Sequence, residues 1–291
     1  MDLSQALNLA IGAIPSGVLY GSIAVGLVLI FRATGTVNLA QGDLYIVGAL
    51  LYAGATGTGW PVLLAVSLAA AVGTTLGVAE ERVVLRPLVK ASPPIRLLAT
   101  VGFALILAGG AYVVFGANPR TGAPIISGST TIGGTKVDLQ LFVLVAVVVG
   151  LVALTWLFFE RSATGKAISA MSQDAEAAQM VGVPVLRMKV MSAGVAGLIA
   201  ATTGALAVPL LFADFTQGLG LALRGFVVMA LVGGQSILAA ALVGLLLAEV
   251  EAYGAYLITT TYVDVVTFSL LVMVVLCAPR IRFLRAFAAE S

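Results

Sequence analysis

Residues 139–159 read LQLFVLVAVVVGLVALTWLFF, a run of 21 residues without a charged side chain. About 20 apolar residues let an α-helix cross the hydrocarbon core of a bilayer. Similar runs occur near residues 8–31, 44–56, 61–79, 97–116, 188–212 and 262–278, with a further apolar segment at 221–248. The sequence therefore predicts an all-α, polytopic transmembrane bundle, with about seven full spans and a re-entrant or broken helix pair.

The composition supports a single membrane domain over residues 1–291. Hydrophobic residues make up 60% of the chain and charged residues only 10%, which leaves no room for a separate water-soluble domain. The chain has no histidine and one cysteine, Cys277. Nucleophilic triads and zinc sites need those residue types, so we expect no catalytic centre, metal site or bound cofactor.

Basic residues predict the orientation of the bundle, because short cytoplasmic loops are enriched in lysine and arginine. If the N-terminus is outside, 12 of the 15 basic residues face the cytoplasm and three face outward. The inner loops are then 80–96 and 161–187, and 117–138 is an outer loop. The C-terminus is expected to be cytoplasmic. The inner set is Arg32, Arg82, Arg86, Lys90, Arg96, Arg161, Lys166, Arg187, Lys189, Arg280, Arg282 and Arg285; the outer set is Arg120, Lys136 and Arg224.

The apolar segment 221–248 is interrupted at its centre by LVGGQSILAA. A cytoplasmic C-terminus requires this segment to enter and leave on the outer face, as two half-helices joined by non-helical backbone. The alternative is one span with a glycine kink, which would place the C-terminus outside. The interrupting residues are Gly233, Gly234, Gln235 and Ser236.

Small residues recur four positions apart within the predicted spans, a spacing that allows helices to approach closely. We interpret these pairs as packing contacts. They are Gly17 and Gly21, Gly73 and Gly77, Ala193 and Gly197, Ala200 and Gly204, and Ala240 and Gly244.

The stretch VNLAQGDLYIVGALL, residues 37–51, places Asn38, Gln41 and Asp43 beside a long apolar run. A carboxylate in hydrocarbon is costly, so Asp43 should face the bundle interior, water or the interface. Two interpretations stay open. In the first, the segment with Gly42 is part of the translocation path or its gate, for which Gly233–Ser236 are also candidates. In the second, Asn38 and Asp43 cap the next helix in a structural turn.

The inner loop 161–187 contains a short helix with signals at both ends. Ser172 suits the N-cap, Asp174 and Glu176 place acidic groups near the first turn, and Gly182 suits the position after the last turn. Such a helix is too short to be stable alone. It is either a solvated connector or a segment that docks into a groove of a partner.

Three blocks resemble the LivH and LivM permeases of branched-chain amino-acid ABC importers. TGKAISAMSQDAEAAQMVGVPV, residues 164–185, is similar to the family's coupling segment. GLVLIFRATGTVNLAQGDLYIVGALL, residues 26–51, and LRGFVVMALVGGQSILAAALVGLLLAEVEAYGA, residues 223–255, resemble two other family blocks, with Leu39, Asp43, Gln235 and Ala239 as departures. The resemblance assigns ATPase coupling to Ser172, Gln173, Asp174, Glu176, Ala177, Ala178 and Gly182.

The resemblance also implies the partners of the chain. These are two cytoplasmic ABC ATPase subunits that use ATP and Mg, a second permease that is LivM-like or another copy of this chain, and an extracytoplasmic substrate-binding protein. The location implied is the prokaryotic inner membrane, and no nucleic acid is involved. ATGKA at 163–167 lacks the glycine and the hydroxyl residue of a phosphate-binding loop, in agreement with ATP hydrolysis elsewhere.

Branched-chain amino acids are the expected substrates, and urea or short amides are the alternative within this class. A secondary transporter or channel without ATPases is the rival class. Such proteins commonly place ionisable residues at mid-membrane, whereas the charges here lie near predicted span ends. A membrane scaffold without transport is a third possibility.

Overall fold

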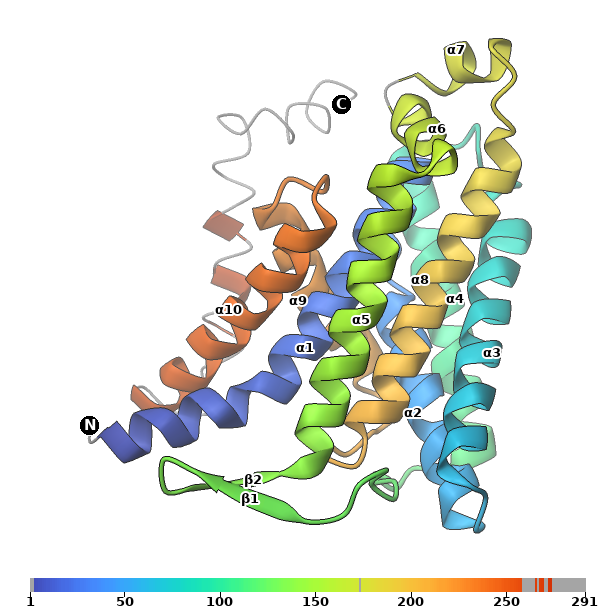
Figure 1. Ribbon diagram of the computed structural model, residues 1–291. Helices are drawn as coiled ribbons and strands as arrows, with labels where there is room; N and C mark the ends of the chain where they lie inside the picture. Colours follow the sequence, from blue (N-terminus) through green and yellow to red (C-terminus); the bar gives the residue numbers. More distant parts are fainter. Residues whose placement is uncertain (1–2, 173, 258–264, 266, 270–271, 274–291) are drawn as a thin grey trace.

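A computed structural model of the protein describes residues 3–172, 174–257, 265, 267–269 and 272–273. Most of these residues are helical (Figure 1). The elements are α1 (Leu3–Thr34), α2 (Gln41–Gly57), α3 (Val62–Glu80), a π-helical turn η1 (Glu81–Leu85), α4 (Pro93–Phe115), β1 (Ser129–Ile132), β2 (Thr135–Asp138), α5 (Leu139–Arg161), α6 (Ala163–Met171), α7 (Ala175–Met180), α8 (Val185–Ala207), α9 (Gly218–Leu231) and α10 (Ile237–Leu257).

The helical membrane fold predicted from the sequence is confirmed. Six helices in the described ranges are long and apolar enough to cross a membrane: α1, α3 with η1, α4, α5, α8 and α10. The predicted segment 44–56 corresponds to α2, whose 17 residues extend about 26 Å, less than the thickness of a typical hydrocarbon core. The predicted span 262–278 lies mostly outside the described residues.

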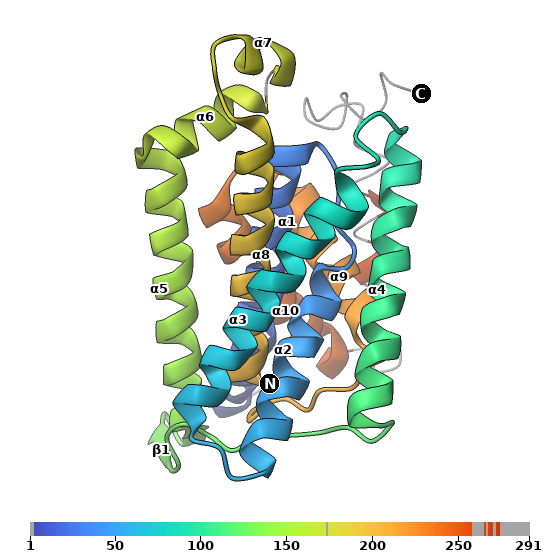
Figure 2. The ribbon, with the colours of Figure 1, turned by 90° about the vertical axis from the view of Figure 1, so that its right-hand side faces the viewer.

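Helices α1 and α8 form the centre of the bundle, and the other long helices surround them (Figure 2). Most residues in the apolar stretches of α1 and α8 are buried, whereas α3, α4 and α5 expose much of their apolar surface. A surface helix that exposes leucine and valine to its surroundings is suited to lipid or to a second membrane subunit.

Small residues allow the close contact between α3 and α8. A side-chain carbon at Gly197 would overlap the carbonyl oxygen of Gly73, and one at Gly77 would overlap that of Ala193. Likewise, a side chain at Gly21 would meet the backbone of Ala241 in α10. The structure therefore explains these pairs as helix-packing positions.

The predicted interruption of segment 221–248 is present between α9 and α10. Gly233 and Gly234 have φ angles of 69° and 65°, a backbone region that favours glycine. The two helices run in opposite directions and are joined toward the end of the bundle that carries α6 and α7 (Figure 1). They are not two equal half-helices, because α9 has 14 residues while α10 has 21 and is long enough to cross the membrane.

The connection from α4 to α5 contains the strand pair β1 and β2, at the end of the bundle opposite α6 and α7 (Figure 1). Ser129 pairs with Asp138 and Ile132 with Thr135 in an antiparallel hairpin. Helix α1 begins at this same end. The predicted loops 117–138 and 161–187 thus lie at opposite ends of the bundle.

Candidate functional site

The polar stretch before α2 lies inside the bundle. Residues 36–38 are non-helical, and α2 begins partway along the bundle (Figure 2). Asn38 and Gln41 are completely buried, and Asp43 is 3% exposed. The expectation that Asp43 avoids lipid agrees with this placement.

Asn38 and the next residue, Leu39, form hydrogen bonds that connect the start of α2 to α3 and α4. Its Oδ1 accepts a hydrogen bond from the backbone N–H of Ala40 at 2.9 Å, and its Nδ2 donates to Oε2 of Glu80 at 2.7 Å. The next residue, Leu39, donates its N–H to Oγ1 of Thr100 in α4 at 3.2 Å. These bonds attach the segment before α2 to both α3 and α4.

Gln41 and Gly42 bring the start of α2 against two further helices. The Gln41 amide donates to the carbonyl oxygen of Ala196 in α8 at 2.9 Å. A side chain on Gly42 would overlap the carbonyl oxygen of Gly218, so glycine is required for α2 to contact the first turn of α9.

Asp43 does not cap α2, whose N-cap residue is Ala40 and has no side-chain hydrogen bond. Its carboxylate instead lies against Gly218, so that two helix N-termini meet beside one buried acidic group. Positive helix-dipole ends favour negative charge at such a position. Asn38 does not cap α2 either, because its side chain accepts from the N–H of Ala40, which precedes the helix.

Several polar atoms around this stretch have no hydrogen-bond partner among the described residues. They are Oε1 of Gln41, Oε1 of Glu80 and Oε2 of Glu81. Unpaired buried acceptors are costly, and they are common where a site binds a ligand or rearranges. The described residues contain no cluster of metal-ligating side chains.

The other four predicted path residues lie elsewhere. Gly233–Ser236 join α9 to α10, whereas Asp43 contacts the opposite end of α9. The 14 residues of α9 separate the two groups by about 21 Å. Gln235 and Ser236 are exposed. The structure does not unite the eight residues in one site.

The predicted coupling segment projects from one end of the bundle (Figure 1). The capping residue of α7 is Asp174, whose Oδ1 accepts a hydrogen bond from the N–H of Ala177 at 2.9 Å. Ser172 instead follows α6, and its hydroxyl donates to the carbonyl oxygen of Ser169. The predicted N-cap is therefore corrected by two residues, and the helix is shorter than expected.

The end of α7 matches the prediction. Gly182 has a φ of 87°, and the N–H of Val183 donates to the carbonyl oxygen of Ala178. Ala178 is buried, while Ala177 is exposed. Glu176 belongs to the first turn of α7, and Gln173 lies outside the described residues.

Two large apolar side chains are exposed at the tip of this segment. Met180 is 86% exposed and Val181 is 82% exposed. Sequence reasoning singled out the alanines of this helix and missed these two residues, although MV before GV is visible in the sequence. We call Met180 and Val181 the apolar tip.

A buried arginine connects α6 to the bundle. Arg32, near the end of α1, forms a 3.0 Å ion pair with Glu160 of α5 and donates a 2.7 Å hydrogen bond to Ser169 of α6. Arg32 is only 7% exposed. These two contacts join α6 to the ends of α1 and α5.

A second ion pair lies deeper in the bundle. Arg224 of α9 and Glu251 of α10 are 3.0 Å apart, and the hydroxyl of Tyr20 donates to Glu251 at 2.7 Å. Thr267 also donates to Glu251. Glu251 is 7% exposed, and its charge is neutralised by an arginine of the neighbouring helix.

Replacing Asn38 with leucine should lower the free energy of unfolding by about 1–3 kcal/mol, because a completely buried Glu80 carboxyl loses its only described hydrogen bond. Detergent unfolding titrations would measure this. The double substitution Asn38→Leu/Glu80→Leu should recover part of the loss, since both polar groups are then removed. Strictly additive losses would contradict a direct interaction.

Comparison with known proteins agrees with this architecture. Residues 9–275 match the family model described as branched-chain amino acid transport system / permease component. The permease protein BraD of Pseudomonas aeruginosa is 26% identical over 96% of this chain and 95% of its own length. LivH of Escherichia coli K12 and LivH of Salmonella typhimurium are each 26% identical over 90% of both chains. Both names describe high-affinity branched-chain amino acid transport.

No solved structure matches the chain significantly. The family match covers nearly the whole sequence, including the polar stretch, the coupling segment and the α9–α10 pair. The chain therefore belongs to the family of permease components of branched-chain amino acid transport systems.

Proposed function

We propose that the chain is the membrane-spanning subunit of an ATP-driven importer for branched-chain amino acids. Leucine, isoleucine and valine are the expected substrates, and the similarity to BraD and LivH, permeases of branched-chain amino acid transport systems, supports this. The chain is one transmembrane domain over residues 1–291, with loop 161–187 in the cytoplasm and loop 117–138 outside. Family membership together with the exposed apolar tip is the observation that carries the proposal.

The mechanism follows from the contacts of the coupling segment. One of the two ATPase subunits binds at α7 of this chain, and the ATP-driven closure of the two subunits moves α6 and α7. Arg32 transmits that motion to α1 and α5, and α8 follows α7 directly along the chain. The extended segment before α2 and the start of α9 then rearrange, so that the path opens first to one side of the membrane and then to the other. Asn38, Gln41, Gly42 and Asp43 belong to this path, while Gly233–Ser236 act as its hinge.

ATP hydrolysis is assigned to the partner subunits. A second permease completes the path, either a LivM-like protein or another copy of this chain, and an extracytoplasmic binding protein delivers the substrate. The outer apolar surfaces of α3, α4 and α5 support such a membrane partner as well as contact with lipid.

Proteoliposomes provide the test of this function. The chain reconstituted with its ATPases, second permease and binding protein should accumulate labelled leucine only when ATP is supplied on the side of the ATPases. Uptake by this chain alone, without nucleotide, would instead support a secondary transporter or channel. Labelled urea is the control for the alternative substrate class.

A further inference from the structure

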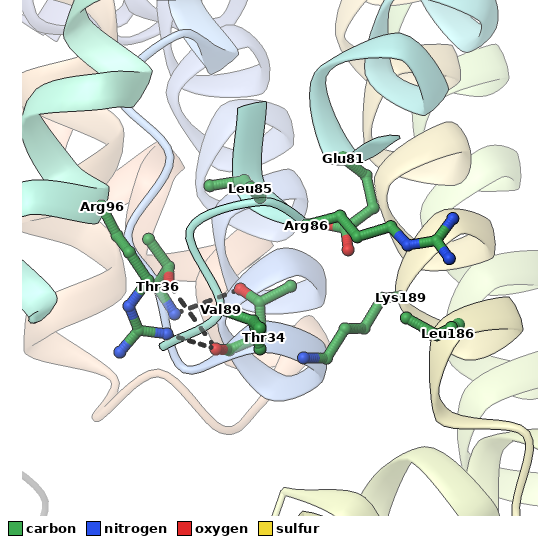
Figure 3. Close-up of a pocket in the computed structure, with 9 residues that line it drawn as sticks. All are labelled: Thr34, Thr36, Glu81, Leu85, Arg86, Val89, Arg96, Leu186 and Lys189. Atoms are coloured by element: carbon green, nitrogen blue, oxygen red, sulfur yellow. Dashed lines mark hydrogen bonds between the residues drawn. The ribbon is translucent and has the colours of Figure 1, made fainter. Parts of the chain in front are cut away.

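A cavity with basic walls lies at the end of the bundle that carries the coupling segment (Figure 3). It has a volume of about 180 Å³. One molecule in liquid water takes up about 30 Å³, so the cavity has room for a group of several heavy atoms. Its walls come from the end of α1, from η1 and the turn after it, and from the starts of α4 and α8. The lining residues are Thr34, Thr36, Glu81, Leu85, Arg86, Val89, Arg96, Leu186 and Lys189.

Three basic side chains line this cavity from three different elements. Arg96 and Lys189 extend toward Thr34 from opposite sides, and Arg86 points toward α8 (Figure 3). Arg96 donates one hydrogen bond to the carbonyl oxygen of Thr34 at 3.1 Å, and its buried Nε has no partner among the described residues.

The positive charge in the cavity is only partly balanced. Glu81 is the acidic lining residue, and it interacts electrostatically with Lys189 and Arg86. In the described part of the chain, Arg86 and Lys189 form no ion pair within 4 Å. The three basic side chains and the single carboxylate leave an excess of two positive charges, which favours an anionic group in the remaining space.

The cavity is amphipathic. Val89 and Leu186 add exposed apolar surface beside the cations, and Ile95 and Leu98 expose apolar side chains on the adjacent first turns of α4. An anionic phospholipid combines a phosphate with apolar chains, and basic side chains at the cytoplasmic surface attract such headgroups. We infer that this cavity binds a phosphate group, with an anionic phospholipid of the inner leaflet as the molecule that fits its charge and its apolar walls best.

Binding there has a mechanical consequence. Leu186 and Lys189 lie on the first turns of α8, shortly after Gly182 of the coupling segment. A phosphate held between Lys189 and Arg96 would tie the start of α8 to α4 and to the end of α1. The inference concerns binding and does not depend on the transported substrate.

Native mass spectrometry of the purified full-length chain in detergent tests the inference by titration with phosphatidylglycerol. Each basic side chain near an anionic headgroup contributes about fivefold to affinity, so Arg86→Gln/Lys189→Gln should weaken binding by about 25-fold. The matched control is Arg82→Gln/Arg187→Gln, which removes two exposed cations outside the cavity. It should retain wild-type binding, and Lys189→Arg should retain most of it.

Two further arms identify the source of the phosphate. Phosphatidylcholine should bind more weakly than phosphatidylglycerol. Competition by inorganic phosphate at millimolar concentration would identify a soluble phosphate as an occupant, and its failure to compete would identify the lipid; both results support a phosphate site. Equal phosphatidylglycerol binding by the cavity variant and the control variant would overturn the inference, as would equal binding of the two lipids by the unmodified chain.

Discussion

Replacing Glu251 with leucine is expected to lower the free energy of unfolding by about 3–5 kcal/mol, because the ion pair with Arg224 inside the bundle is then broken. Tyr20 and Thr267 also lose their acceptor. The pair connects α9 to α10 across the break at Val232–Ser236, and Tyr20 connects it to α1. SDS titration of the purified chain in mixed micelles, followed by circular dichroism, measures the effect.

The same pair offers two controls. Arg224→Met/Glu251→Leu removes both charges and should recover most of the stability, because burial of apolar groups replaces a costly ion pair. Glu249→Gln changes a half-buried carboxylate two residues away and should have a small effect. If Glu251→Leu unfolds at the same SDS fraction as Glu249→Gln, the pair does not stabilise the α9–α10 break.

Replacing Met180 and Val181 with aspartate is expected to abolish ATP-driven uptake while leaving membrane insertion unchanged. Hot-spot side chains at a protein interface contribute about 2 kcal/mol or more each, and a buried aspartate adds a desolvation cost. Co-purification of the ATPase subunit and leucine uptake in proteoliposomes measure the two expected losses.

A control at the opposite end of the bundle distinguishes local from general effects. Ile132 is 46% exposed at the tip of the β1–β2 hairpin. Ile132→Asp introduces one aspartate in place of the two of the double substitution and should leave ATPase binding intact. Retention of the ATPase by Met180→Asp/Val181→Asp would show that the apolar tip is not the docking point.

The number and type of elements could largely be predicted, because apolar runs of about 20 residues have few structural alternatives in a membrane. The interruption of 221–248 was also visible, because two adjacent glycines break the apolar run. In the structure, Gly233 and Gly234 both have positive φ angles. The small-residue pairs also carried specific information, since Gly73 and Gly197 meet where two backbones approach.

Long-range pairing could not be predicted from local patterns. The predicted apolar segment ended at residue 248, yet α10 continues to Leu257. An arginine 27 positions away in sequence neutralises Glu251. Asn38 was visible as a polar residue in an apolar context, but its partner Glu80 is 42 positions away, in the predicted inner loop 80–96.

The coupling segment shows a third kind of difference. The composition of 172–182 located the helix and its end at Gly182, but several residues could serve as its N-cap. Asp174 was visible as an acidic first-turn residue and proved to be the cap. Exposure of Met180 and Val181 depends on how α6 and α8 position α7, which no local pattern encodes.

Photo-cross-linking tests the central claim most directly, that a separate ATPase works on the bundle through the tip of α7. A photoreactive amino acid at Val181 and, separately, at Ile132 would be introduced into the assembled importer. The account predicts cross-links from position 181 to the ATPase subunit and none from position 132. Cross-links from 181 to the extracytoplasmic binding protein, or from 132 to the ATPase, would contradict it.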